Sequence, residues 1–213
     1  MKKLNRNAFL LKNGINLEEF DRLSSSRNIL KKYSIPVKKP IIGFVGKWEN
    51  WMKIEDFLNA SKYLKDIMFL VIGKGRNFTK YKNEFKNVIF TGRIPHEHTV
   101  SFLMNFDICV SPHSKDKMMQ FRSARKTLEY MAAGKPIIVS NVVGREKFLK
   151  EGVNCLLYES ENPEDLVEKI NILLSDRKLI NRIGINNKKL SNKFTWEKSV
   201  YGSGLLIALN KRK

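Results

Sequence analysis

Short apolar runs alternate with amphipathic segments over most of this chain. The apolar runs lie at residues 40–46, 67–73, 88–91, 106–111, 136–140 and 155–158. The segments between them have apolar residues at helical spacing and lie at 51–65, 77–86, 97–105, 124–133, 144–151 and 163–175. Near-continuous apolar strands are typical of a parallel sheet that helices cover on both faces. The pattern therefore predicts an α/β fold, a Rossmann-like, doubly wound parallel sheet of six strands.

Local signals mark several of the expected boundaries. Residues 162–165, Asn-Pro-Glu-Asp, form a helix start with a capping residue, a proline in the first turn and acids beside the free N–H groups. Residues 134–136, Gly-Lys-Pro, indicate a helix end. After the last apolar run the pattern predicts helices only, at 178–193 and 198–209. Residues 40–192 contain no linker, so we expect one domain there.

The composition adds a strong positive charge to an otherwise ordinary globular chain. Of 213 residues, 40 are Lys or Arg and 21 are Asp or Glu, giving a formal net charge of +19. Such a field favours phosphorylated substrates, nucleic acid or an anionic membrane surface, although lysines spread along the whole chain are equally consistent with simple solvation. No apolar run is long enough for a membrane span, no signal peptide is evident, and Cys109 and Cys155 lie in apolar runs like reduced core cysteines. These features predict a cytoplasmic protein.

The stretch 123–140 carries the most informative candidate chemistry. Its helix, with Glu129 as the one acidic residue, runs into Gly134 and a buried strand. In an open α/β sheet, ligands bind beyond the carboxyl ends of the strands, where the N–H groups of a helix start can hold a phosphate. A carboxylate further along the same helix can accept hydrogen bonds from two vicinal hydroxyls. A phosphate site next to a diol site indicates a nucleotide.

Two other strand ends carry candidate phosphate ligands. The first apolar run ends in Gly46, Lys47 stands on the outgoing loop, and Lys53 follows in the opening turn of the next helix. Two cations at a strand end suit a diphosphate, and two solvated lysines are the alternative. The second run leads into Gly73 and Gly75, which either let a ligand approach the backbone or form a tight turn.

Other ligand signatures are incomplete. The dinucleotide fingerprint G-x-G-x-x-G fails at Phe78, which stands in place of the third glycine and counts against an NAD-dependent enzyme. His96 and His98 lack a third metal ligand nearby, and the chain has no Asp-x-Asp pair, so we expect no metal. The polar loop 111–126 carries five Lys or Arg against one Asp, and its place just before Glu129 favours ligand contacts over a mobile surface loop.

Together these residues resemble the C-terminal, nucleotide-sugar-binding half of a GT-B fold retaining glycosyltransferase of the group 1, or family 4, type. The markers in family order are Asn13-Gly14-Ile15-Asn16 with Phe20, Gly46-Lys47 with Lys53, Gly73-Lys74-Gly75, Phe90-Thr91-Gly92-Arg93, Asp107 to Pro112, Leu128-Glu129 to Ile137, Gly152 to Leu157, and Phe194-Thr195-Trp196. The resemblance covers nearly the whole chain. It implies a post-linker segment at 1–39, a donor-binding domain at 40–192, and a C-terminal helix with a basic tail at 193–213.

The resemblance also implies roles for individual residues. Glu129 would hold the ribose hydroxyls, Lys47 and Lys53 would neutralise the diphosphate, and N–H groups near Ser123 and Lys126 would add hydrogen-bond donors. The resemblance also counts three glycines among the residues that bind the donor; these are Gly46, Gly73 and Gly75. No catalytic residue is assigned within this chain.

Three positions depart from the family pattern. Phe121 stands where the family often has a first glutamate, although Ser123, Lys126 and Glu129 fit a Ser-x-x-Lys-x-x-Glu variant of the motif. The other two are Lys47, in place of an arginine and its bidentate fork, and Ile54, in place of a glycine.

On this resemblance the substrate is a nucleoside-diphosphate sugar, bound without a metal ion or other cofactor. The whole enzyme would transfer the sugar, with retention, to a glycan or glycolipid acceptor. The acceptor-binding N-terminal domain has no counterpart here, so we expect little or no activity from this chain alone. It is then a domain of a larger enzyme, one subunit of a split glycosyltransferase, or a non-catalytic remnant.

Two further partners follow from the charge. A nucleic-acid partner is not expected, because no stacking-aromatic sheet motif or recognition-helix pattern accompanies the basic residues. Peripheral contact with the inner face of a membrane would be assisted by the tail at 211–213, Lys-Arg-Lys, for which simple solvation is the alternative.

Overall fold

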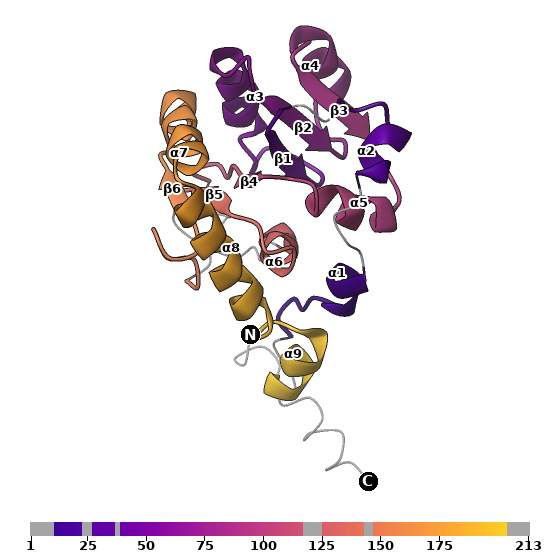
Figure 1. The fold of residues 1–213 in the computed structure, drawn as a ribbon, viewed down its shortest axis with the longest axis vertical. Coiled ribbons are helices and arrows are strands. Elements are labelled where there is room, and N and C mark those ends of the chain that lie inside the picture. The colour runs from indigo at the N-terminus through magenta and orange to yellow at the C-terminus, as the bar shows by residue number, and fades with distance from the viewer. Residues whose placement is uncertain (1–10, 23–26, 37–38, 117–124, 143–146, 204–213) are drawn as a thin grey trace.

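In the computed structural model, six parallel strands form one sheet in the order β3-β2-β1-β4-β5-β6 (Figure 1). The described residues are 11–22, 27–36, 39–116, 125–142 and 147–203. The strands are β1 (Ile41–Val45), β2 (Met68–Ile72), β3 (Val88–Gly92), β4 (Ile108–Ser111), β5 (Ile137–Ser140) and β6 (Leu156–Tyr158). The doubly wound parallel sheet predicted from the apolar runs is confirmed.

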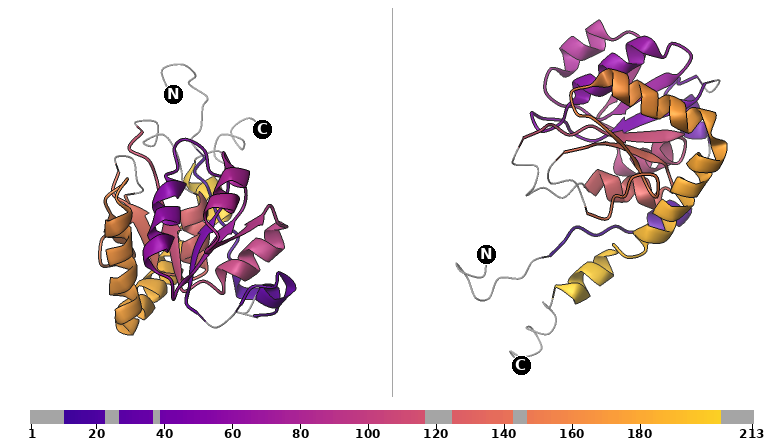
Figure 2. Two further views of the ribbon diagram at one scale, coloured as in Figure 1. Left: turned by 90° about the horizontal axis from the view of Figure 1, so that it is seen from above. Right: turned by 90° about the vertical axis from the view of Figure 1, so that its left-hand side faces the viewer.

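Helices cover both faces of the sheet (Figures 1 and 2). On one face lie α3 (Ile54–Tyr63), α4 (Phe78–Glu84) and α7 (Pro163–Ser175), and on the other lie α5 (His96–Leu103) and α6 (Arg125–Ala132). The long α8 (Arg177–Ser191) packs against both α6 and α7. The remaining described helices are α1 (Glu18–Arg22), α2 (Asn28–Lys32) and α9 (Trp196–Gly202).

Alternate residues of the central strand β1 face two separate hydrophobic cores. Ile41 and Val45 belong to the core beneath α5 and α6, whereas Ile42 and Phe44 belong to the core beneath α3, α4 and α7. All the residues of β1 are therefore buried, and its sequence is apolar without interruption. The same packing explains why Cys109 of β4 is a free and fully buried cysteine.

The predicted start of α7 is confirmed, and one predicted helix is wrong. Asn162 caps α7 by accepting a hydrogen bond of 3.0 Å from the N–H of Asp165. The helix predicted at 144–151 is wrong over its described residues, because 147–151 contain no helix. There the side chain of Asn154 accepts from the N–H of Lys150 (2.7 Å) and donates to the carbonyl of Phe148 (2.9 Å). A side chain that satisfies these backbone groups replaces the helical hydrogen bonds.

Residues near the two ends of the described chain pair with each other. The N–H of Ile15 donates to the carbonyl of Phe194 (2.8 Å), and Ile15 forms an isolated parallel bridge with Thr195. Figure 2 shows the two segments running side by side below the sheet. This pairing brings the start of α9 close to α6, which carries Glu129.

We predict that Gly184→Ala destabilises the fold, because α8 meets the end of α6 at this residue. A Cβ at Gly184 would lie 2.4 Å from the carbonyl oxygen of Gly134, so the two helices would have to move apart. The expected loss is about 1–3 kcal/mol of unfolding free energy, in spite of the better helix propensity of alanine. Urea unfolding measures it. Gly202→Ala in α9 is the matched control, since a Cβ there meets nothing within 4 Å. Equal effects of the two substitutions would contradict the close packing.

Candidate functional site

The carboxyl ends of β1, β2 and β3 meet at a cavity of about 220 Å³. Gly46 and Gly73 have φ angles of +124° and +120°, in the region that favours glycine. A Cβ at Gly73 would lie 2.3 Å from the carbonyl oxygen of Gly46, so the two backbones touch. The residues that line the cavity are Val45, Gly46, Lys47, Ile72, Gly73, Lys74, Arg93, Ile94 and Thr99. The structure thus brings together the predicted residues Gly46, Lys47 and Gly73, and it adds Arg93 and Thr99.

Gly75 lies against protein backbone. A Cβ at Gly75 would come within 2.2 Å of the carbonyl oxygen of Trp48, and the N–H of Arg76 donates to the same oxygen at 3.3 Å. Contacts between the β1 and β2 loops are therefore sufficient to account for both Gly73 and Gly75. This favours the tight-turn interpretation of the Gly73-Lys74-Gly75 segment.

Lys126 extends from α6 to the end of β1. Its Nζ lies 4.4 Å from the centroid of the Phe44 ring and donates to Sδ of Met52 at 3.6 Å. A Cβ at Gly46 would lie 3.5 Å from this Nζ. One turn further along α6, the hydroxyl of Tyr130 accepts a hydrogen bond of 2.9 Å from the N–H of Val45. These contacts hold the first turn of α6 beside Gly46.

Lys47 contacts a carboxylate of its own loop, and Lys53 contacts one from the loop after β6. Nζ of Lys47 lies 2.6 Å from Oε1 of Glu49, and Nζ of Lys53 lies 3.1 Å from Oε1 of Glu161. Lys53 precedes α3, and its N–H donates to the carbonyl of Pro112 after β4 (3.1 Å). Lys53 therefore lies at the same edge of the sheet as Lys47, but toward β4 and β6 and outside the cavity.

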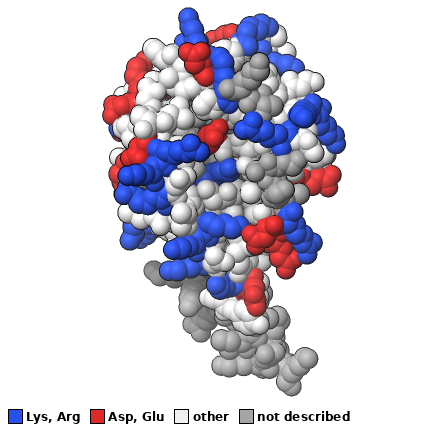
Figure 3. All heavy atoms as spheres, viewed as in Figure 1, with Lys and Arg blue, Asp and Glu red and all other residues white. Residues whose placement is uncertain are grey.

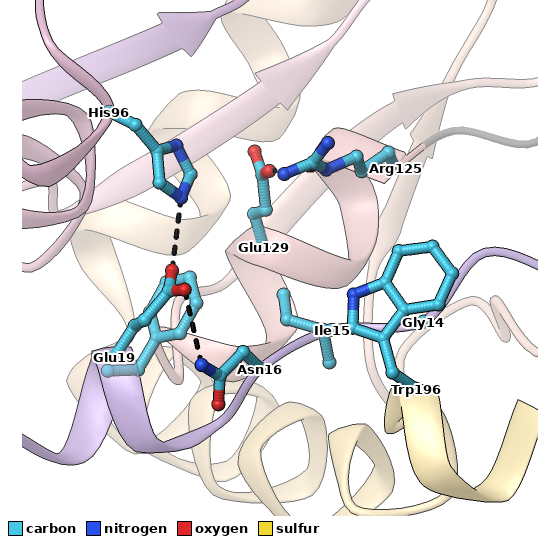
Figure 4. A pocket seen from close by; sticks show the side chains of 9 residues that line it. Gly14, Ile15, Asn16, Glu19, His96, Arg125, Glu129 and Trp196 are labelled. Atoms are coloured by element: carbon cyan, nitrogen blue, oxygen red, sulfur yellow. Dashed lines mark hydrogen bonds and ion pairs between the residues drawn. The ribbon is translucent and has the colours of Figure 1, made fainter.

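Glu129 lies in a second, small pocket beside α6 (Figure 4). Its Oε1 accepts from Nε of Arg125 at 3.1 Å, and its side chain is 13% exposed. Burial raises the pKa of Glu129, and the positive charges of Arg125 and Lys126 offset part of that shift. The other lining residues are Gly14, Ile15, Asn16, Glu19, Phe20 and Trp196. The carboxylate is therefore desolvated, and among the described residues its ion-pair partner is Arg125.

The surroundings of Glu129 come from segments far apart in the sequence. In Figure 4, His96 of α5 points toward Glu19 of α1, with Nε2 and Oε2 3.0 Å apart, while Asn16 donates to Oε1 of Glu19 at 3.2 Å. His96 and Thr99 of the same helix α5 line the two different cavities. Helix α5 therefore borders both the Glu129 pocket and the cavity at the end of β1.

His113, to which the sequence assigned no role, contacts the ends of β4 and β5 and the loop after β6. Its Nε2 lies 2.9 Å from Oγ of Ser111, its N–H donates to Oγ of Ser140 at 2.7 Å, and its carbonyl accepts from Oγ of Ser160 at 2.7 Å. Burial, aided by the charge of Lys126, lowers its pKa to about 3, so the imidazole is neutral. A polar residue in a polar loop gives no sequence signal for such burial.

The remaining predicted residues have simple placements. His96 and His98 have different partners, because His98 contacts the hydroxyl of Tyr33 at 2.7 Å. Among the described residues, no three His, Cys, Asp or Glu side chains are grouped as metal ligands. Ser123 and Phe121 lie outside the described residues. No helix in the described ranges has the length and apolar character needed to cross a membrane.

The comparisons with known proteins identify a family. Residues 25–190 match the model of the family described as Glycosyl transferases group 1. The uncharacterized glycosyltransferase MJ1178 of Methanocaldococcus jannaschii is 32% identical over 164 residues, which are 75% of this chain and 45% of that protein. N,N'-diacetylbacillosaminyl-diphospho-undecaprenol alpha-1,3-N-acetylgalactosaminyltransferase of Campylobacter jejuni is 31% identical over 175 residues, 78% of this chain and 44% of that protein. The family resemblance seen in the sequence is confirmed, and the chain spans less than half of these two relatives.

Solved structures share the fold at lower sequence identity. Alr3699/HepE of Anabaena, crystallised in complex with UDP-glucose, superposes with a TM-score of 0.78 at 15% identity. The match covers 93% of this chain and 56% of that chain. The sheet and helices described above are therefore those of a GT-B glycosyltransferase domain.

We predict that Glu129→Gln raises the melting temperature at pH 7 and has a smaller effect near pH 4. Burial holds the pKa of Glu129 above its ordinary value of 4.5, so the folded protein binds this proton more tightly than the unfolded chain. The resulting stabilisation is complete below the unfolded value and is lost as the pH rises through the folded one. Glutamine does not undergo this loss. Circular dichroism melts at both pH values measure it, with Glu97→Gln on the exposed side of α5 as the control. A variant that is equally destabilised at both pH values would contradict the prediction.

Proposed function

The chain belongs to the glycosyl transferases group 1 family, and we propose that it is the donor-binding domain of a glycosyltransferase. The donor would be a nucleoside-diphosphate sugar held without a metal ion. One observation carries this proposal: α6 presents the Lys126 ammonium beside Gly46 and the buried Glu129 carboxylate one turn further on. A single helix thus offers a cation for a phosphate and a carboxylate for a diol.

The cations around the end of β1 suit a diphosphate leaving group. Lys47 and Lys126 flank Gly46, and Lys53 lies nearby at the start of α3. When the bond between sugar and diphosphate breaks, negative charge grows on the diphosphate, and ammonium groups already in position stabilise it. The cavity of about 220 Å³ is smaller than a typical site for a whole ligand, so it would take one portion of the donor.

The rest of the reaction requires groups beyond this chain. We propose transfer of a hexose-like sugar, with retention, to a glycan or glycolipid acceptor. The Anabaena neighbour was crystallised with UDP-glucose, and the Campylobacter relative is named for transfer to a diphospho-undecaprenol-linked sugar. Since the chain spans less than half of MJ1178 and of the Campylobacter relative, the acceptor side would come from another domain or a separate subunit. The isolated chain would then show little or no transfer.

We also propose that the protein works at the cytoplasmic face of a membrane, in peripheral contact with anionic lipid. Helix α8 has basic residues and no acidic one, and Lys and Arg gather on the face that it crosses (Figure 3). The basic residues of α8 are Arg177, Lys178, Arg182, Lys188 and Lys189. Each such residue near an anionic surface contributes about 1 kcal/mol of attraction.

We predict that Glu129→Ala weakens binding of a nucleoside diphosphate by about tenfold or more. Hydrogen bonds from ribose hydroxyls to a carboxylate contribute about 1.5–3 kcal/mol, and their loss reduces the affinity accordingly. Isothermal titration calorimetry with UDP, GDP and ADP identifies the base that binds and measures the change.

Two controls make this measurement specific for the ribose. Glu84→Ala, at the exposed end of α4, removes the same charge far from the site and should leave binding unchanged. The 2′,3′-dideoxy form of the bound nucleotide should bind weakly to the parent chain and lose nothing further in Glu129→Ala. Equal binding of the ribose form by the parent and Glu129→Ala chains would remove the ribose role, and no binding of any nucleotide would overturn the proposed function.

A further inference from the structure

The loop between β6 and α7 places a carboxylate directly on one of the proposed diphosphate ligands. Oε1 of Glu161 lies 3.1 Å from Nζ of Lys53. The two side chains are 49% and 35% exposed, so the contact is open to solvent and to a competing anion. Two residues earlier, Oε1 of Glu159 lies 2.7 Å from Nζ of a different lysine, Lys115.

The backbone of Glu161 is held in place by buried groups. Its N–H donates to Oδ2 of Asp56 at 2.9 Å, and the same oxygen accepts from the hydroxyl of Tyr158 at 3.0 Å. Asp56 is 4% exposed and lies in the first turn of α3, just after Lys53. The preceding Ser160 donates from Oγ to the carbonyl of His113 at 2.7 Å. The loop is therefore fixed relative to the start of α3, on which Lys53 sits.

Glu161 also adopts a conformation that a glutamate rarely takes. Its φ angle is +70°, in the left-handed region, which is strained for a residue that has a side chain. Residues in such conformations persist where the surrounding structure holds them, and they are concentrated at functional sites. Here the strained backbone directs a carboxylate toward Lys53. A glycine or asparagine would relieve the strain but would not supply that charge.

We propose that Glu161 sets the affinity of the donor site by occupying Lys53 until a donor diphosphate displaces it. The inference rests on the proposed function, because it takes Lys53 as a diphosphate ligand. The carboxylate substitutes for a phosphate oxygen in the ligand-free protein and keeps the ammonium paired. When the donor binds, Lys53 exchanges Glu161 for a diphosphate oxygen, and the glutamate turns into solvent. When the diphosphate product leaves, Glu161 returns to Lys53.

The proposed exchange predicts whether removal of the Glu161 carboxylate strengthens or weakens diphosphate binding. If Glu161 only supported Lys53 in its position, removal of the carboxylate would weaken diphosphate binding. As a competitor for the same ammonium, it lowers the affinity, and its removal strengthens binding. Exposed ion pairs contribute about 0.2–1 kcal/mol, which corresponds to a gain in affinity of up to about fivefold.

Calorimetric titration of the full chain with UDP, GDP and ADP tests the proposal. Glu161→Gln keeps the size of the side chain and the backbone N–H of residue 161, and it removes the negative charge. We expect the nucleotide that binds to the parent chain to bind about two- to fivefold more tightly to this variant. The matching nucleoside, which has no phosphate to compete for Lys53, should bind with unchanged affinity when followed by NMR shift titration.

Two further variants separate direct exchange from a general field effect. Glu159→Gln removes the same charge from the same loop but releases Lys115, so its effect should be smaller than that of Glu161→Gln. In a Lys53→Gln background, Glu161→Gln should leave diphosphate affinity unchanged.

The proposal fails if Glu161→Gln binds the nucleotide equally or more weakly, if Glu159→Gln matches it, or if its effect persists without Lys53. Each of these results requires that the parent chain binds a nucleotide, so the proposed function would stand. Absence of binding in both the parent chain and Glu161→Gln would overturn the two together.

Discussion

The contact between the backbones at Gly46 and Gly73 is the constraint on which the site depends. The N–H of Gly46 donates to the carbonyl of Ile72, and the N–H of Gly73 donates to the carbonyl of Gly92, both at 2.8 Å. Three parallel strands are thus joined edge to edge beyond their regular ladders. A side chain at Gly73 would force the first two apart. Each glycine is followed at once by a cation, so the contact places three positive charges on one cavity; these are Lys47, Lys74 and Arg93.

The ligand-free site balances several of its own charges. Lys47 contacts Glu49, Lys53 contacts Glu161, and Glu129 contacts Arg125, in each case within 3.1 Å. For these three side chains, ligand binding would be an exchange of partners, because each of them already has a counterion. The arrangement limits electrostatic repulsion among cations in a protein with a net charge of +19. It also limits affinity, since each new contact that Lys47, Lys53 or Glu129 makes would replace an existing ion pair.

The sequence predicted the fold, and it singled out part of the candidate site, for reasons that particular residues show. Strand β1 was visible because both of its faces are buried, and Glu129 was visible because its helix ends in Gly134 before another buried strand. The counterion of Lys53 was not visible, since its contact with Glu161 joins residues far apart in sequence through loop conformation. The helix expected at 144–151 was wrong in its described part. The Asn154 side chain bonds to the backbone groups of Lys150 and Phe148, and these bonds take the place of helical ones.

The glycines show a different limit of sequence reasoning. The segment Gly73-Lys74-Gly75 allowed either a ligand contact or a tight turn. The sequence does not show what fills the space beside each glycine Cα. At Gly75 that space holds the backbone of Trp48. A glycine in the sequence can indicate that another group approaches the backbone closely, but it does not identify whether that group belongs to the protein or to a ligand.

The pairing of Ile15 with Thr195 gives the Glu129 pocket a mechanical connection to the C-terminal helix. Trp196 begins α9 and forms one wall of this pocket, and a Cβ at Gly14 would lie only 2.5 Å from the Cα of Trp196. Because these hydrogen bonds hold the start of α9 against the residues before α1, residues 14–16 and Trp196 together build one wall of the pocket. A substitution in either segment would therefore alter the surroundings of Glu129 without touching α6 itself.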